Sequence, residues 1–227
     1  MSRRILPMSS RAGTQQQSVA DALARLVEAR RGAESVWVEA LRELGAVDQA
    51  VYEAVADTST PELDGPVRRL SNAASYSRLW LGVAAVLAVL GGRRGRRAAL
   101  EGVLAIGVTS ATVNLGMKPL AQRRRPDRAG HAVFAARRVP MPESDSFPSG
   151  HAASAFAFAY AVGRHLPELA VPIRLLAGGV AYSRVHIGVH YPGDVVIGSI
   201  VGAGTAATVA AACDRIYRRQ DPNCEPA

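Results

Sequence analysis

Three stretches of the sequence bring together histidines, hydroxyl groups and basic side chains in patterns that suit the chemistry of phosphate esters. They are KPLAQRRRP (118–126), PSGH (148–151) and SRVHIGVHYPGD (183–194). Arginine forks match the oxygens of a phosphate, and a lysine ammonium adds a point charge. The combination predicts a phosphorylated ligand. Each stretch alone has a plainer interpretation, as a capped helix start, a solvated basic loop or a chance pairing of histidine with aspartate.

Two of the histidines have complementary chemical features. His190 is followed four residues later by Asp194, and a carboxylate on one ring nitrogen leaves the other nitrogen free as a nucleophile or base. His151 comes from a different stretch and could give a proton to a leaving oxygen. We therefore predict His190, His151 and Asp194 as catalytic residues of a phosphoryl-transfer site that works by positioning and charge stabilisation.

The phosphate itself is expected to lie among cations and backbone amides. PSGH precedes an apolar run, so its last residues place amides at a helix N-terminus, where anions bind, and glycine allows close approach. The predicted phosphate-binding residues are Lys118, Arg125, Ser149, Gly150 and Arg184.

The remaining histidines do not predict a metal site. His186 precedes His190 by four residues, a spacing that metal-binding pairs use on helices. Gly188 and Pro192 would interrupt a helix there, and cysteines or carboxylates to complete a site are missing. We predict neither a metal nor another cofactor. The other two histidines lack comparable partners and are expected at the surface: His131 and His165.

Five apolar runs surround the three stretches, at 77–92, 98–117, 151–163, 169–183 and 195–213. A spanning helix needs about 20 mostly apolar residues, a length that the second and fifth runs reach easily. Basic and proline-rich loops separate the runs. We predict an all-α fold, an integral membrane helical bundle of about five spanning helices.

The alternative fold is a soluble all-helical protein with buried core helices. Glu101 within the second run and Arg174 within the fourth favour it, unless both lie near the membrane interfaces. In an antiparallel bundle, the end of the second run and the start of the third lie at one end. The end of the fourth run and the start of the fifth lie at that same end. The three polar stretches are therefore expected to converge.

The N-terminal region differs in character from the bundle. Apolar residues recur there at helical spacing, but the segment is too polar to span a bilayer. We expect a disordered tail over 1–17, amphipathic membrane-surface helices over 18–76, the transmembrane bundle that carries the three stretches over 77–214 and a polar tail over 215–227. Lysine and arginine exceed the acidic residues by 27 to 19, giving a net charge of +8, which favours anionic partners such as nucleic acid, lipid headgroups or a phosphorylated substrate.

Together the three stretches resemble the three-part signature of the type-2 phosphatidic acid phosphatase superfamily. The matching positions are Lys118 with Arg125 and Pro126, then all of PSGH, then Ser183, Arg184, His190 and Asp194. The resemblance is strong over about residues 118–194, and residues 1–60 are covered weakly or not at all. It implies a helical bundle and a metal-free phosphohistidine mechanism. In that mechanism His190 resembles the nucleophile, Asp194 its orienting acid and His151 the general acid.

The resemblance implies a membrane phosphatase for a lipid phosphate or diphosphate, such as an isoprenoid phosphate or phosphatidate. The expected partners are this substrate and the bilayer, with no nucleic acid; oligomeric state is not readable. Two alternatives remain: a soluble acid phosphatase or vanadate-dependent haloperoxidase of the same superfamily, and a non-enzymatic basic lipid-binding protein. RRGRR (93–97) is expected opposite the site, so the positive-inside rule favours a multi-pass cell-membrane protein whose active site faces outward.

Overall fold

The computed structural model describes residues 28, 32, 36, 38–129 and 132–220. It divides into two compact units, Met1–Val47 and Asp48–Ala227. In the first unit the described residues from 38 to 47 are helical. The predicted tail over 1–17 and the position of His131 lie outside the described residues. The second unit contains the helices that carry the three motifs.

A bent pair of helices opens the larger unit after the helical residues 48–57. The pair consists of α2 (Pro61–Ala73) and α3 (Arg78–Leu90), joined by the short helix η1 (Ser75–Ser77). Pro61 is the first residue of α2, and Glu62 and Asp64 lie in its first turn, where a helix favours proline and acidic side chains. Tyr76 and Ser77 have left-handed φ angles of 54° and 58°, and the two helices meet there at 63°.

The remaining helices follow the apolar runs closely. In chain order they are α4 (Gly92–Ala111), the π-helix η2 (Thr112–Met117), α5 (Lys118–Ala121), η3 (Ala132–Ala135), α6 (Gly150–His165), η4 (Pro167–Leu169), α7 (Ala170–His186) and α8 (Pro192–Gln220). The described part of the chain contains helices and loops and no strand. The all-α prediction is confirmed.

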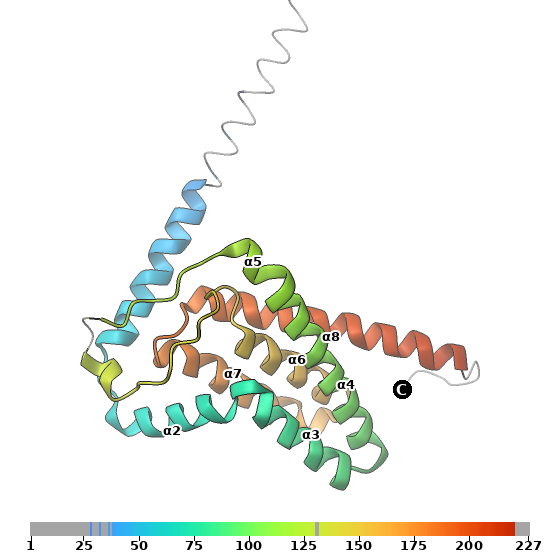
Figure 1. Cartoon of the computed structure of the whole chain (residues 1–227). Coiled ribbons are helices and arrows are strands. Elements are labelled where there is room, and N and C mark those ends of the chain that lie inside the picture. Colours follow the sequence, from blue (N-terminus) through green and yellow to red (C-terminus); the bar gives the residue numbers. More distant parts are fainter. Residues whose placement is uncertain (1–27, 29–31, 33–35, 37, 130–131, 221–227) are drawn as a thin grey trace, which may run out of the picture. The chain divides into compact units, whose positions relative to one another are not determined.

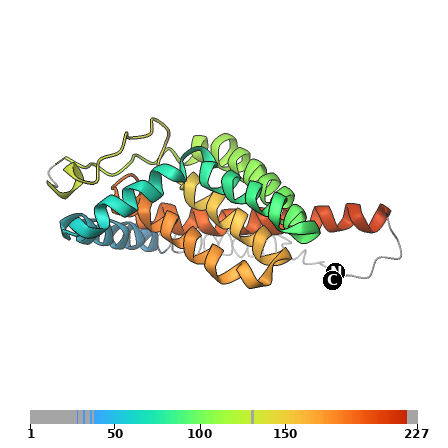
Figure 2. The ribbon, with the colours of Figure 1, turned by 90° about the horizontal axis from the view of Figure 1, so that it is seen from below.

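Helix α6 lies in the middle of the larger unit, packed against α4, α7 and α8 (Figures 1 and 2). Its alanines at 152, 153, 155, 157, 159 and 161 are buried, so neighbouring helices can approach closely. Bulkier side chains fill the core beside it, where the rings of Trp80 and Phe158 lie 5.5 Å apart. Because α6 begins at Gly150, the PSGH motif is held by the most enclosed helix of the unit.

Glycines on α8 set the close contact with α6. A Cβ atom on Gly198 would lie 2.5 Å from the carbonyl oxygen of Ser149, and one on Gly202 would lie 2.0 Å from that of Ala153. Real Cβ atoms do not approach backbone oxygens that closely. The sequence GSIVG therefore presents a small-residue face that places the start of α8 directly against the start of α6.

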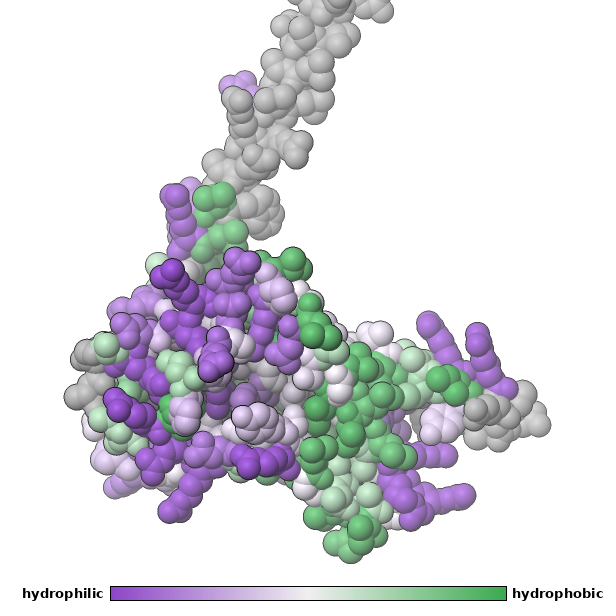
Figure 3. Space-filling model, in the orientation of Figure 1, coloured by the Kyte–Doolittle hydropathy of each residue, from purple (hydrophilic) through white to green (hydrophobic). Residues whose placement is uncertain are grey.

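Two described helices are long and apolar enough to cross a membrane: Gly92–Ala121 and Pro192–Arg219. The bent pair Pro61–Ala73 and Ser75–Leu90 would make a third if it counts as one span. In Figure 3, hydrophobic side chains gather over α3 and α4, and hydrophilic ones cover the end that carries the loop between α5 and α6. Helices able to span a membrane are therefore present among the described residues, and the expected number of five stays a prediction.

The three motifs converge at one end of the bundle, as expected. Ser149 donates its backbone N–H to the carbonyl of Asp194 at 2.9 Å, which joins the start of α6 to the start of α8. At the other end of α6, the Arg94 side chain donates to the carbonyl of His165 at 3.0 Å. RRGRR therefore lies opposite the motifs.

The expectation that His165 is an unpartnered surface residue is wrong. Its Nε2 lies 2.9 Å from a carboxylate oxygen of Glu101, and only 19% of its side chain is exposed. The cause is the side-by-side packing of α4 and α6, which brings Glu101 to the end of α6. The same contact explains how an acid is accommodated inside the second apolar run.

The proposed division at residue 76 stays a prediction. Helix α2 packs against α7 and buries Asp64 and Ser71. Residues 61–73 thus contribute side chains to the interior of the bundle, whatever their relation to the membrane surface.

The contact between α8 and α6 predicts opposite effects for two glycines on one helix. Gly202→Ala should lower the free energy of unfolding by about 1–3 kcal/mol, the usual cost of overpacking, because the added methyl group meets the backbone of Ala153. Gly204 has nothing within 4 Å of an added Cβ, so Gly204→Ala should be neutral or stabilising by up to about 1 kcal/mol. Thermal unfolding of both variants in one detergent tests this, and equal stabilities would contradict it.

Candidate active site

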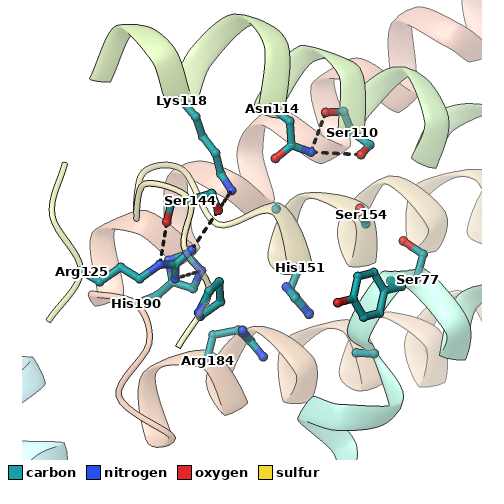
Figure 4. A pocket seen from close by; sticks show the side chains of 14 residues that line it. Ser77, Ser110, Asn114, Lys118, Arg125, Ser144, His151, Ser154, Arg184 and His190 are labelled. Carbon is teal, nitrogen blue, oxygen red and sulfur yellow. Dashed lines mark hydrogen bonds between the residues drawn. The ribbon is translucent and has the colours of Figure 1, made fainter. Parts of the chain in front are cut away.

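A pocket of about 300 Å³ opens where the three motifs meet (Figure 4). Six of the eight predicted site residues line it: Lys118, Arg125, Gly150, His151, Arg184 and His190. The other two, Ser149 and Asp194, are fully buried beside it. The structure therefore brings the predicted residues together from α5, α6, α7, α8 and the loops between them.

His190 lies between a carboxylate and a guanidinium. Its Nδ1 is 3.4 Å from a carboxylate oxygen of Asp194, and its Nε2 is 3.2 Å from an Nη atom of Arg125. A guanidinium can only donate hydrogen bonds, so Nε2 must accept and the proton must be on Nδ1, facing Asp194. This tautomer places the lone pair of Nε2 at the wall of the pocket, where it accepts the hydrogen bond from Arg125.

The imidazole of His190 is nearly fully buried. Burial lowers its pKa to about 4, helped by the positive charges of Arg125 and Arg184, while the hydrogen bond that His190 donates to Asp194 opposes the shift. A His pKa lowered this far leaves the ring neutral at pH 7. His190 is thus in the protonation state that a nucleophile requires.

The backbone that presents His190 is shaped by the end of α7. The helix stops at His186, and Gly188 adopts φ +70°. A side chain at that position would meet the ring of Phe134 at 2.7 Å, so only glycine fits. The amides of Val189 and His190 then donate to the carbonyl of Arg184 at 3.1 and 3.2 Å, which fixes the nucleophile candidate just beyond the helix.

Arg125 and Lys118 are held by a loop that carries Ser144. Arg125 donates to the carbonyl oxygens of Ser144 and Val189, both at 2.8 Å. Lys118 donates to the hydroxyl of Ser144 at 2.9 Å. These contacts hold two positive charges over the pocket, near Nε2 of His190.

Arg184 supplies a third cation from α7. Its Nη1 donates to the hydroxyl of Ser71 on α2 at 2.6 Å, and the side chain is almost wholly buried. Its Nε has no hydrogen-bond partner among the described residues. A buried donor without a partner is costly, and a phosphate oxygen in the pocket would satisfy it.

Two further buried polar atoms beside the pocket also lack partners among the described residues: Oγ of Ser149 and Nε2 of His151. Both belong to the first turn of α6 and its cap, where Ser149 has an extended backbone before the helix begins. Free amides and a free hydroxyl at a helix N-terminus favour an anion. With Arg184, these groups form an incomplete set of donors that an oxyanion would complete.

The sequence did not single out the residues that hold Asp194. One carboxylate oxygen accepts from the hydroxyl of Ser146 and from the backbone N–H of Tyr191, and the other accepts from Arg123 at 2.8 Å. Arg123 also binds the carboxylate of Asp48 at 2.6 Å. A weak signal existed for Arg123: two-residue spacing in an extended segment puts Arg123 and Arg125 on one side. Nothing local marks Asp48 or Ser146.

Asp48 completes a partly buried chain of charged side chains. Its second oxygen accepts from the backbone N–H of Gly193 at 2.6 Å, and the guanidinium of Arg123 lies 4.3 Å from the centre of the Tyr191 ring. The chain Asp48–Arg123–Asp194–His190 fixes both the loop before α8 and the orientation of the imidazole.

His186 belongs to a different cluster. Its Nε2 lies 2.9 Å from Asp64, and the same carboxylate oxygen accepts from the buried Arg137 at 2.7 Å. Arg137 also donates to the carbonyl of Val55 at 3.0 Å. The cluster ties α2, α7 and the loop after η3 together. Among the described residues, no group of three or more histidine, cysteine or acidic side chains is arranged for a metal ion.

Comparison with known proteins identifies the family to which these motifs belong. The sequence model of the PAP2 superfamily matches residues 98–218, which include all three motifs. The chain belongs to the PAP2 superfamily. This confirms the resemblance seen in the motifs.

Several members of the PAP2 superfamily are similar to this chain. Decaprenylphosphoryl-5-phosphoribose phosphatase of Mycobacterium tuberculosis is 36% identical over 164 residues, covering 72% of this chain and 87% of the relative. The enzyme of that name from Mycolicibacterium smegmatis is 35% identical, covering 70% and 83%. Lipid A 1-phosphatase of Rhizobium johnstonii is 32% identical over 93 residues, covering 40% of this chain and 34% of that protein.

Solved structures support the fold. The transmembrane PAP2-type phosphatidylglycerolphosphate phosphatase of Bacillus subtilis has a TM-score of 0.59 at 24% identity and covers 77% of this chain and 88% of its own. LpxE of Aquifex aeolicus has a TM-score of 0.61 at 22% identity, covering 72% and 94%. At these identities the likeness concerns the arrangement of helices.

Arg123 is expected to act as a positioning residue through Asp194. Arg123→Gln removes a charged hydrogen bond to each of two carboxylates, a loss of about 1.5–3 kcal/mol per bond. We expect kcat on a lipid phosphate to fall about 10- to 100-fold with little change in KM, because the phosphate-facing cations stay in place. Arg123→Lys should recover part of the rate.

The neighbouring Arg124 is exposed, so Arg124→Gln serves as the matched control and should keep the parental kcat. Thermal unfolding of the same samples separates a loss of positioning from a loss of fold. Equal kcat in Arg123→Gln and Arg124→Gln would contradict the assignment.

Proposed function

We propose that the protein is a membrane phosphatase that hydrolyses a lipid phosphate through a covalent phosphohistidine on Nε2 of His190. The observation that carries this proposal is the lone pair of Nε2. It faces a pocket with three cations, on a ring whose other nitrogen is bound to a buried carboxylate. The names of the mycobacterial and rhizobial relatives specify phosphates on lipids, which supports the same substrate class here.

The first half of the reaction forms the phosphoenzyme. Nε2 of His190 attacks phosphorus, and the bond from phosphorus to the ester oxygen breaks. The phosphate anion bound in the pocket favours the protonated imidazole of His151, which gives its proton to that oxygen, so the lipid product leaves as a neutral alcohol. Asp194 stabilises the positive charge that develops on the imidazole through the proton on Nδ1.

The second half returns the enzyme to its starting state. Water attacks phosphorus while His151, now neutral, takes the proton of that water. The bond from phosphorus to Nε2 breaks, and inorganic phosphate leaves with His190 neutral again. Lys118, Arg125 and Arg184, with the amides at the start of α6, stabilise the equatorial oxygens in both halves.

We further propose that the protein crosses the cell membrane several times with its active site on the extracytoplasmic face. The arginines of 93–97 lie at the end of the bundle opposite the pocket, and Arg218 and Arg219 lie in the last turn of α8. An excess of arginine favours the cytoplasmic side. Accessibility of a cysteine introduced at position 93 to a membrane-impermeant reagent in intact cells tests this orientation.

The leaving group separates the roles of the two histidines. A lipid alkoxide needs a proton to leave, whereas nitrophenolate does not. His151→Ala should therefore lose at least about 10-fold more of its phosphoryl-transfer rate on a lipid monophosphate than on a nitrophenyl phosphate. With the nitrophenyl ester it should accumulate an acid-labile, base-stable phosphoenzyme. His190→Ala should lose both activities and trap no phosphate.

Single-turnover assays in detergent measure these rates. His165→Gln serves as the control because it lies at the far end of α6 and should keep the parental rates. A phosphoenzyme in His190→Ala, or equal losses on both substrates in His151→Ala, would refute the mechanism.

A further inference from the structure

The pocket has two halves of different chemistry (Figure 4). One half holds the cations and His190. The other half is lined by neutral polar side chains: Ser77, Ser110, Asn114 and Ser154. His151 lies between the halves. The phosphate cradle uses none of these neutral groups, so they need a separate explanation.

The neutral half is where the leaving group must lie. In-line displacement puts the leaving oxygen opposite the attacking nitrogen, and His151 must reach that oxygen to protonate it. Ser154 follows His151 by three residues on α6, so both lie on the same face of the helix. The part of the substrate attached to the leaving oxygen therefore extends past His151 toward Ser154, Ser110 and Asn114.

The backbone around this half is unusual at two places. Asn114 belongs to the π-helix Thr112–Met117, and π-helical turns inside α-helices occur often at functional sites. Tyr76 and Ser77 have left-handed φ angles of 54° and 58°, which are unfavourable for residues other than glycine. Both irregular segments supply side chains to the same half of the pocket, and such irregularities cluster at ligand-binding positions.

The hydrogen-bonding capacity of this half suits hydroxyl groups. The amide nitrogen of Asn114 donates to the carbonyl of Ser110 at 2.9 Å and lies 3.2 Å from its hydroxyl. The amide oxygen of Asn114 is then left to accept a hydrogen bond, and the hydroxyl of Ser110 is left to donate one. Ser154 is only 8% exposed. Alcohol groups both donate and accept, so they complement this set.

The charge of the lining argues against two other kinds of leaving group. Among the residues that line the pocket, the lysine and arginines are Lys118, Arg125 and Arg184, all of which belong to the phosphate cradle. A diphosphate substrate would place a second phosphate among neutral side chains, without a cation to stabilise it. A cationic headgroup would find no carboxylate in the lining.

We propose that Ser77, Ser110, Asn114 and Ser154 form a subsite for a neutral polyhydroxylated leaving group, so that the substrate is a lipid-linked sugar phosphomonoester. The proposal rests on the proposed phosphatase function and narrows its substrate. The pocket contacts the sugar through its hydroxyls, and the lipid portion extends beyond the pocket. The phosphoribose in the name of the mycobacterial relatives agrees with this chemistry.

The test compares substrates that differ in hydroxyl groups alone. Octyl ribofuranoside 5-phosphate and its 2,3-dideoxy analogue share the lipid tail and the class of leaving alcohol. Detergent-purified full-length protein should hydrolyse the ribose compound with a kcat/KM at least about 10-fold higher, because a site built for hydroxyls discriminates against analogues that lack them. Farnesyl diphosphate should be hydrolysed with a lower kcat/KM than the ribose compound.

Substitutions in the pocket test which residues produce the preference for ribose over dideoxyribose. Asn114→Leu and Ser154→Ala should each reduce the ratio of kcat/KM for ribose over dideoxyribose by about 5- to 10-fold. Thr112→Val is the matched control, because Thr112 is an exposed residue of the same π-helix and its hydroxyl donates to the carbonyl of Val108. It should keep the ratio. Two variants from different helices, with thermal unfolding of each, guard against a loss of fold.

The outcomes distinguish a failure of the subsite proposal from a failure of the proposed phosphatase function. Equal kcat/KM on the ribose and dideoxyribose compounds, or faster hydrolysis of farnesyl diphosphate, would overturn the subsite while phosphatase activity remains. A higher kcat/KM on free ribose 5-phosphate than on the octyl compound would overturn the lipid link. Release of phosphate from none of these substrates would instead refute the proposed phosphatase function.

Discussion

The site depends on the hydrogen bonds and charge pairing of the buried Asp194 carboxylate. It accepts hydrogen bonds from Ser146, the Tyr191 amide and Arg123, and it lies beside Nδ1 of His190. Its own backbone carbonyl binds the amide of Ser149 at the start of α6. A buried charge is stable only when it is paired and hydrogen-bonded. The need to satisfy Asp194 therefore draws the PSGH motif, the basic loop and the nucleophile candidate to one point.

Close helix packing makes that convergence possible. Gly198 and Gly202 let α8 contact the backbone of α6 directly, so that Ser149 and Asp194 can share a hydrogen bond. Larger residues on either helix would separate the two motifs. The small-residue content of the sequence is thus a requirement of the site's geometry as well as a feature of membrane helices.

Sequence reasoning located the motif residues because their chemistry is local. A helix start, a His–Asp spacing and a run of cations can each be read from a few neighbouring letters, and their convergence follows from antiparallel helices. Asp48 could not be found this way, since it lies 75 residues from Arg123 and only the fold brings them together. His165 was misplaced for the same reason, because its partner Glu101 belongs to another helix. No glycine or proline lies at the bend at Tyr76 and Ser77, so the sequence does not predict it.

The most direct test of the account is an experimental structure of the protein with orthovanadate, which can adopt the five-coordinate geometry of a phosphoryl group in transfer. We expect vanadium bound to Nε2 of His190, with its equatorial oxygens against Lys118, Arg125, Arg184 and the amides at the start of α6. His151 should lie beside the apical oxygen, on the side of Ser154. Vanadium bonded to His151, or held away from Nε2 of His190, would contradict the central claim.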